Sequence, residues 1–220
     1  MGVPFLVSRP FTLALFGGSG ATGQAIICEA VQRGIGIRGL VREGSSLGEH
    51  GGQVVEVRGS LTDVRAIAQT LKDADAVSIV IGPRPPYREA FCARATGLIL
   101  ETMRRHGITR VACQTGAMIG DYPANQSFLL KQMAKLFQRQ RPEIARDRAE
   151  QERLIRTSGL EWTLIKPPRL TNGPRSKRFK AGADLKAGLL SSVSRADVAA
   201  FTLDEVFSSQ HIREAVFIAG

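Results

Sequence analysis

The amino-acid sequence predicts an α/β protein built on a Rossmann-like, doubly wound parallel sheet in three layers. Three observations support this fold class. Short apolar runs alternate with longer stretches of helical periodicity. The first apolar run leads directly into the glycine-rich segment GGSGATG, which opens a helical stretch. The chain has 220 residues, a length that suits one ordinary domain.

The strands are predicted from runs rich in Val, Ile, Leu and Phe that are bounded by turn-forming or polar residues. These runs are Phe11–Phe16, Ile37–Val41, Val54–Val57, Ala76–Ile81, Arg110–Cys113, Trp162–Ile165 and Ala215–Ile218. Most are apolar throughout, which is typical of strands covered on both faces. Gly82-Pro83 ends the fourth run and Pro167-Pro168 ends the sixth.

Helices are predicted between these runs from apolar residues spaced three or four apart. The predicted helices are Ala21–Arg33, Asp63–Leu71, Glu89–Arg105, Gln126–Gln140, Glu143–Thr157 and Arg195–Phe207. Thr62 and Ser194 are predicted as N-caps, and Pro142 separates the fourth helix from the fifth. Strands that alternate with crossover helices predict a parallel sheet with helices on both faces.

One segment, Arg169–Leu190, has no clear period. We expect it to form a small irregular lobe over the active site, covering about residues 169–190. The chain shows no internal repeat and no low-complexity linker. We therefore predict a single domain over residues 1–220.

Composition narrows the class of protein but does not identify it. Lys and Arg number 30 against 20 Asp and Glu, so the formal net charge of +10 favours acidic or phosphorylated partners. The three cysteines form no CxxC pair and the three histidines have no ligand-like spacing, so no metal site is predicted. No apolar run approaches the roughly 20 residues that span a bilayer, and no signal peptide is evident. A cytoplasmic protein without membrane attachment is the expectation.

The glycine loop is the strongest motif in the sequence. It follows the first predicted strand, opens the first helix, and comprises Gly17, Gly18, Ser19, Gly20, Ala21, Thr22 and Gly23. In such a loop, Gly17 permits the tight turn, Gly20 lets the backbone approach a pyrophosphate, and Gly23 allows close packing. Gln24 stands where a P-loop requires lysine. The motif therefore predicts dinucleotide binding, with a purely structural turn as the alternative.

The end of the second strand indicates which dinucleotide is bound. It lies about 20 residues beyond the loop and reads Leu40-Val41-Arg42-Glu43. An arginine here can pair with the 2′-phosphate of NADP(H), whereas a carboxylate would bind the free ribose of NAD(H). Arg42 comes first and Ser45 follows as a hydroxyl donor, so NADP(H) is favoured. Glu43 keeps NAD(H) open.

Further segments fit one known group of proteins. They are Gly59 after the third strand, Ile81-Gly82 after the fourth, Ser158-Gly159-Leu160, Pro167-Pro168 and residues 194–199, SRADVA. Together with the glycine loop and Leu40-Val41-Arg42, they make residues 11–218 resemble the atypical, NmrA-like short-chain dehydrogenase/reductase group. Within that group the chain is most similar to NADPH-dependent flavin and biliverdin-IXβ reductases.

The resemblance implies NADP(H) along the carboxyl ends of the strands, with its nicotinamide near the fifth and sixth. It adds to the cofactor-binding candidates Ser60, Leu61, Gly82, Thr115 and Pro167. The sequence departs from the group at three of its positions. Ser60 replaces the usual Asp, and Thr115 and Arg169 replace the Ser and His of the most similar reductases. These changes leave cofactor binding open and the substrate undetermined.

Ketone-reducing members of the group use a Tyr-x-x-x-Lys pair for proton exchange. The chain has two tyrosines, Tyr87 and Tyr122, and neither is followed by lysine at that spacing. The resemblance places the pair near Ile144 and Arg148, which are not of the required types. This favours hydride transfer to a flavin, a quinone or a related conjugated acceptor.

The candidate catalytic residues are Thr115, Arg169 and Lys166, which would orient the acceptor and stabilise developing negative charge. The alternatives are a strand-end hydroxyl for Thr115 and a surface residue before a turn for Lys166. Tyr87 is interpreted either as a cover for the nicotinamide or as a residue that packs its loop.

Two stretches concentrate positive charge. They are Lys131, Lys135, Arg139, Arg141, Arg146 and Arg148, and then Arg169, Arg175, Lys177, Arg178 and Lys180. They would attract an anionic acceptor such as a flavin phosphate or a carboxylated tetrapyrrole, or simply be solvated. A third interpretation is a docking surface on a non-catalytic, NADP(H)-binding redox sensor of the NmrA type. No nucleic-acid-binding motif is present, which argues against nucleic acid. Monomer and homodimer both stay open.

Overall fold

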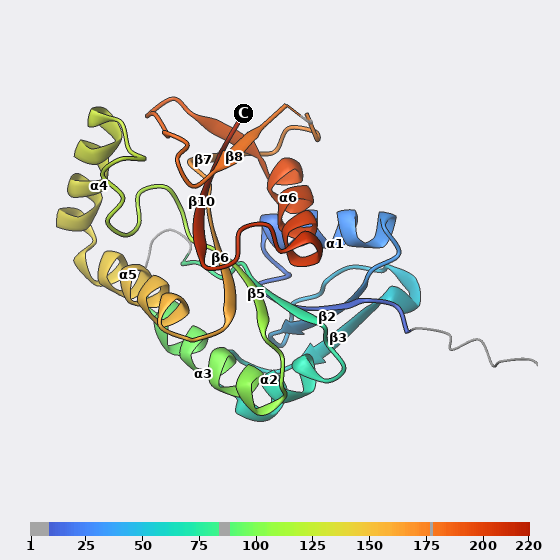
Figure 1. The fold of residues 1–220 in the computed structure, drawn as a ribbon. Coiled ribbons are helices and arrows are strands. Elements are labelled where there is room, and N and C mark those ends of the chain that lie inside the picture. Colours follow the sequence, from blue (N-terminus) through green and yellow to red (C-terminus); the bar gives the residue numbers. More distant parts are fainter. Residues whose placement is uncertain (1–8, 84–88, 177) are drawn as a thin grey trace, which may run out of the picture.

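A computed structural model describes residues 9–83, 89–176 and 178–220. Within these residues, eight strands form one sheet in the order β3-β2-β1-β4-β5-β6-β10-β8 (Figure 1). All neighbouring strands run parallel except β8, which pairs antiparallel with β10. The strand order turns back between β1 and β4, which is the place where open α/β sheets bind their ligands. The predicted Rossmann-like fold class is confirmed.

Every predicted strand forms, with ends shifted by one or two residues. The strands of the sheet are β1 (Thr12–Phe16), β2 (Gly36–Val41), β3 (Val54–Arg58), β4 (Ala76–Ile79), β5 (Arg110–Gln114), β6 (Glu161–Lys166), β10 (Glu214–Ala219) and β8 (Lys180–Gly182). A short 3-10 helix, Gly51–Gln53, leads into β3. The fourth strand ends before Val80, earlier than the prediction of Ala76–Ile81.

The predicted irregular lobe is only partly irregular. Residues 169–190 contain β7 (Arg169–Thr171), which pairs with β9 (Ser192–Ser194) in a separate two-stranded sheet, and they also contain β8. Both short strands depend on partners distant in sequence, so neither leaves a periodic pattern of its own. The prediction missed them for this reason.

The helices are α1 (Ala21–Gln32), α2 (Val64–Leu71), α3 (Cys92–Arg105), α4 (Phe128–Gln140), α5 (Pro142–Arg156) and α6 (Arg195–Ser208). The predicted cap at Ser194 is confirmed, since its side chain accepts from the backbone N–H of Asp197. The predicted cap at Thr62 is wrong, because the Asp63 carboxylate accepts from the first turn of α2 instead. Likewise, Ser127 caps α4, so this helix starts after Gln126.

Helix α3 begins at Cys92 rather than at the predicted Glu89. Its cap is supplied from another helix: the carboxylate of Asp147 on α5 accepts the N–H groups of Cys92 at 2.9 Å and Ala93 at 3.0 Å. A cap 55 residues away along the chain satisfies the helix end as well as a local one does. No local sequence pattern could reveal it.

Helices cover both faces of the sheet. Figure 1 shows α1 and α6 on one side and α2, α3 and α5 on the other. Each side has its own apolar core: Ile27 and Leu203 belong to the first, and Ile67, Ile99 and Ile155 to the second. Helix α4 lies outside α5, at the periphery of the molecule (Figure 1). The three predicted layers are thereby present.

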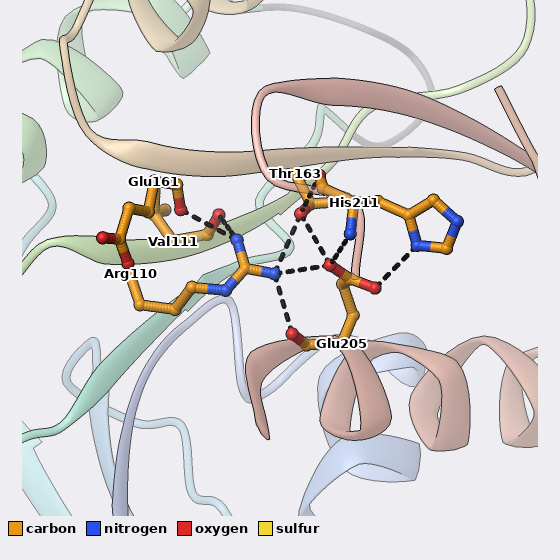
Figure 2. A network of polar contacts seen from close by, with 6 residues as sticks. All are labelled: Arg110, Val111, Glu161, Thr163, Glu205 and His211. Atoms are coloured by element: carbon orange, nitrogen blue, oxygen red, sulfur yellow. Dashed lines mark hydrogen bonds and ion pairs between the residues drawn. The ribbon is translucent and has the colours of Figure 1, made fainter. Parts of the chain in front are cut away.

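A buried ion pair fastens α6 to the sheet at the amino end of β5. The guanidinium of Arg110 donates to the Glu205 carboxylate at 2.8 Å and to the Thr163 hydroxyl at 2.9 Å (Figure 2). The backbone N–H of His211 donates to the same carboxylate at 2.8 Å, and the His211 Nδ1 lies 2.8 Å from its other oxygen. The side chains of Arg110 and Glu205 are 6% and 1% exposed. This cluster lies opposite the end of the sheet at which the candidate site is found.

Candidate cofactor and active site

The glycine loop has the backbone geometry that the sequence predicts. Gly17 has φ +99°, and a Cβ there would lie 2.8 Å from the backbone of Val80. A Cβ on Gly23 would lie 2.3 Å from the Gly17 carbonyl oxygen. Gly23 therefore allows α1 to pack against the loop itself, and both positions require glycine.

Helix α1 starts directly from this loop with Gly20 as its N-cap, a residue that has no side chain to cap the first turn. The loop faces a groove of about 910 Å³. The predicted residues that line it are Gly17, Ser19, Gly20, Ala21, Thr22, Arg42, Ser60, Leu61 and Gly82. A groove of this volume at a helix N-terminus that begins with glycine fits the pyrophosphate and ribose groups of a dinucleotide.

Other predicted cofactor residues do not line this groove. Gly18 and Gly23 lie behind the loop, where Gly18 meets Leu47 and Gly23 meets Gly17. The carbonyl of Ser45 accepts from Arg58 at 2.8 Å, and Ser45 is not part of the groove wall. Thr115 and Pro167 are also absent from the wall. Their contact with the cofactor stays a prediction.

Arg42 lies on the wall of the groove and its side chain is exposed. Within the described residues it makes no ion pair. Glu43 is not part of the wall. The other carboxylate near the end of this strand, Glu56, is already engaged by Arg58 at 2.8 Å and by Ser46 at 2.7 Å. Arg42 is therefore the cation at the end of β2 that can select between the two dinucleotides.

A buried polar cluster lies at the carboxyl ends of β5 and β6. Thr115 directly follows β5 and Lys166 ends β6, and because these strands pair in parallel, the two side chains meet. Lys166 is fully buried, so its interpretation as a surface residue is wrong. Its Nζ forms an ion pair with Glu152 and donates to the Ile119 carbonyl at 2.8 Å. The Thr115 Oγ1 lies 3.4 Å from the same nitrogen.

Glu152 is the centre of this cluster, and sequence reasoning missed it. Thr115 Oγ1 donates to one carboxylate oxygen at 2.6 Å, and the Tyr122 phenol donates to the other at 3.0 Å. The available signal was its place on α5. Ile144, Arg148 and Ile155 share the buried face of that helix with Glu152. A carboxylate on an inward face needs a partner, and that partner is Lys166.

Burial changes the proton affinities within this cluster. Removal from water lowers the pKa of Lys166 to about 8, even though the neighbouring Glu152 carboxylate favours the ammonium form. Burial and the same carboxylate raise the pKa of the Tyr122 phenol, which therefore keeps its proton. The Lys166 Nζ also lies 4.2 Å from the centre of the Tyr122 ring, a cation–π contact. Lys166 is thus the group in the cluster that can give up a proton near neutral pH.

Arg148 connects this cluster to the groove. Its guanidinium donates to the carbonyl of Ile81, on the groove wall, at 2.9 Å and to the carbonyl of Thr115 at 2.8 Å. Arg148 is buried, so its assignment to a basic surface cluster is wrong. It holds the ends of β4 and β5 together. The Arg148 guanidinium therefore links Thr115 to the groove wall.

Other predicted residues stand apart from the cluster. Arg169 is exposed on β7 and makes none of the cluster's described hydrogen bonds, so its catalytic role stays a prediction. Tyr87 and Lys177 lie outside the described residues.

Where the structure describes the chain, no His, Cys, Asp or Glu side chains gather in threes around a possible metal position. In the same residues, no helix is long and apolar enough to cross a membrane.

The fold and the groove define a Rossmann-like dinucleotide-binding protein. A family model described as NAD(P)H-binding matches residues 17–209. The chain belongs to this NAD(P)H-binding family.

Solved structures with this fold cover nearly the whole chain. A Burkholderia pseudomallei protein named as exported is 24% identical, covering 96% of this chain and 100% of its own, with a TM-score of 0.72. ChuY, an anaerobillin reductase from Escherichia coli O157:H7, is 19% identical over 94% and 96%, with a TM-score of 0.77. A wide-type short-chain dehydrogenase/reductase from Veillonella parvula, solved with NADP, is 16% identical over 96% and 95%, with a TM-score of 0.79. The expected resemblance is confirmed at the level of family and fold.

Proposed function

We propose that the protein is an NADPH-dependent reductase whose substrate is a conjugated acceptor such as a flavin, a quinone or a tetrapyrrole. The observation that carries the proposal is the Thr115–Glu152–Lys166 cluster at the carboxyl ends of β5 and β6, which Arg148 links to Ile81 on the groove wall. The names of ChuY as a reductase and of the Veillonella protein as an NADP complex support the same chemistry.

NADPH held in the groove would supply a hydride, so the acceptor would need one further proton. In this chain, Thr115 is the member of the cluster best placed to touch the acceptor, since Lys166 and Glu152 are buried and Thr115 is only partly so. For the transfer, the Thr115 hydroxyl turns its proton from Glu152 toward the acceptor, gives it up, and receives one from Lys166 Nζ, 3.4 Å away. Lys166 becomes a neutral amine and regains its proton from solvent.

Lys166 and Glu152 act as positioning residues in this scheme. The Glu152 carboxylate holds both the Thr115 hydroxyl and the Lys166 ammonium. The lowered pKa of Lys166 makes loss of its proton accessible. Arg148 fixes the position of Thr115 relative to the groove. No tyrosine–lysine pair is needed for this transfer.

Turnover is tested by mixing the protein with NADPH and a panel of flavins, quinones and tetrapyrroles, and by following the loss of NADPH absorbance. We expect at least one acceptor to be reduced. Tight NADPH binding without reduction of any acceptor would instead indicate a non-catalytic redox sensor, and the reductase proposal would be wrong.

The preference for NADPH rests on Arg42. Replacing Arg42 with alanine is expected to weaken NADPH binding about 10- to 100-fold, because one charged contact to the 2′-phosphate is lost. NADH binding should not change. Titration of both cofactors measures this, with Arg65→Ala as the control, since Arg65 is exposed and lies off the groove wall. Equal loss for both cofactors, or no loss for either, would exclude Arg42 from phosphate recognition.

Thr115 has a separate prediction. Thr115→Val keeps the shape of the side chain and removes the hydroxyl, so kcat is expected to fall by about 100-fold. Thr115→Ser keeps the hydroxyl and should retain most of the activity. Steady-state rates with saturating NADPH distinguish the variants. A valine variant as active as the wild type would show that the proton comes from elsewhere.

A further inference from the structure

A second cavity, of about 510 Å³, lies where the loop after β5 meets α4 and α5. Its size falls in the range of small-molecule sites. Much of its wall is apolar, with Met118 and Ile119 from the loop, Ala134 and Phe137 from α4, and Ala145 from α5. A wall of this kind suits the apolar atoms next to the charged group of a ligand. The sequence indicated the basic residues Lys131 and Lys135 here but not the cavity that they line.

The cavity also carries positive charge. Lys131 and Lys135 lie one turn apart on α4 and both line the cavity. Within the described parts of the chain, neither ammonium group has an ion-pair partner. The carboxylate on the wall is that of Asp121. Two free cations beside an apolar wall fit a ligand with an apolar body and an anionic group.

The cavity adjoins the candidate catalytic cluster through its own wall. The carbonyl of Ile119 accepts from Lys166 at 2.8 Å. Gly120 has φ +75°, and a Cβ there would lie 2.5 Å from the nearer Glu152 carboxylate oxygen and 2.6 Å from the Tyr122 ring. The loop that covers the Lys166–Glu152 pair is therefore also the wall of the cavity. That loop separates a molecule bound here from the cluster.

We propose that this cavity binds the anionic part of the acceptor, a phosphate or carboxylate held by Lys131 and Lys135, with apolar atoms against Met118 and Phe137. The inference rests on the proposed reductase function for the identity of the ligand as an acceptor. Binding itself needs no turnover and can be measured alone. The cavity thus narrows the substrate class to conjugated acceptors that carry an anionic group.

The test uses ligand pairs that differ only in charge. FMN is compared with riboflavin, and a tetrapyrrole dicarboxylate with its dimethyl ester, by equilibrium titration in the presence of NADP⁺. At least one anionic ligand is expected to bind about tenfold or more tightly than its uncharged partner. The flavin pair reports a phosphate and the tetrapyrrole pair reports carboxylates. Equal affinity within both pairs would overturn the inference.

Variants test whether the preference for the anionic ligand arises in this cavity. Lys131→Gln/Lys135→Gln should remove the preference for the anionic ligand. The matched control is Arg139→Gln/Arg146→Gln, which removes the same charge from exposed positions on α4 and α5 outside the cavity. Ala149→Phe, at an exposed position on the cavity wall, should weaken charged and uncharged ligands about tenfold and leave NADPH binding unchanged. Equal losses in the lysine and arginine variants would indicate only long-range charge and overturn the inference.

The two proposals fail in different ways. Binding of FMN that depends on Lys131 and Lys135, without reduction of any acceptor, would support the cavity and contradict the reductase. Reduction with kinetics that the lysine variant leaves unchanged would support the reductase and contradict the cavity.

Discussion

Replacing Lys166 with methionine is expected to lower the free energy of unfolding by about 3–5 kcal/mol, because the variant leaves the buried Glu152 carboxylate without its cation. The remaining donors to Glu152, from Thr115 and Tyr122, are neutral and cannot replace the charge. Denaturant unfolding measures the loss. Wild-type stability in this variant would show that Glu152 is already neutral in the folded protein.

A double variant separates stability from catalysis. Glu152→Gln/Lys166→Met removes both charges, so most of the stability should return. Activity should not return, because the donor behind Thr115 is gone, and kcat is expected to stay about 100-fold below wild type. A double variant with wild-type kcat would remove Lys166 from the proton path.

The pH profile gives an independent readout of the same residue. The active form holds its proton at Lys166 Nζ, whose pKa is lowered to about 8. The wild-type kcat should therefore be level below that pH and fall about tenfold per unit above it. The Glu152→Gln/Lys166→Met variant should lack this descent. If Lys166 had only a structural role, this variant would keep the pH profile of the wild type.

The fold and the cofactor groove could be predicted from local sequence patterns. Continuous apolar runs predict strands buried on both faces, and the order of strands and helices leaves few possible topologies. The glycine loop could be predicted because its chemistry is contained in seven consecutive residues, Gly17–Gly23. Arg42 could be predicted because the end of the second strand lies about 20 residues beyond the glycine loop. These features depend on sequence neighbours.

The catalytic cluster depends on contacts between distant segments. Thr115, Glu152 and Lys166 come from two strand ends and a helix, and the sequence indicates only that Thr115 and Lys166 follow neighbouring strands. Glu152 has no local signal apart from its place on an inward helix face. The same reason explains the missed cap of α3 by Asp147 and the missed strands β7 and β8. Tertiary partners decide these features.

Replacing Glu205 with leucine is expected to destabilise the protein by about 3–5 kcal/mol, because the Arg110 guanidinium then stays buried without a carboxylate (Figure 2). Burial already lowers the pKa of Arg110, with Glu205 opposing that effect. The Arg110→Met/Glu205→Leu variant should recover much of the loss. Thermal or denaturant unfolding measures both variants.

This pair also serves as the control for Lys166. Arg110 begins β5, whereas Lys166 ends the neighbouring strand β6, so the two ion pairs lie at opposite ends of the sheet. Both ion pairs are buried, so breaking either one should lower the free energy of unfolding by a similar amount. Only the Lys166 pair should change kcat and its pH profile in protein that is still folded. An equal loss of kcat in the Arg110→Met/Glu205→Leu variant would mean that the Lys166 effect reflects folding alone, and the proposed proton path would fall.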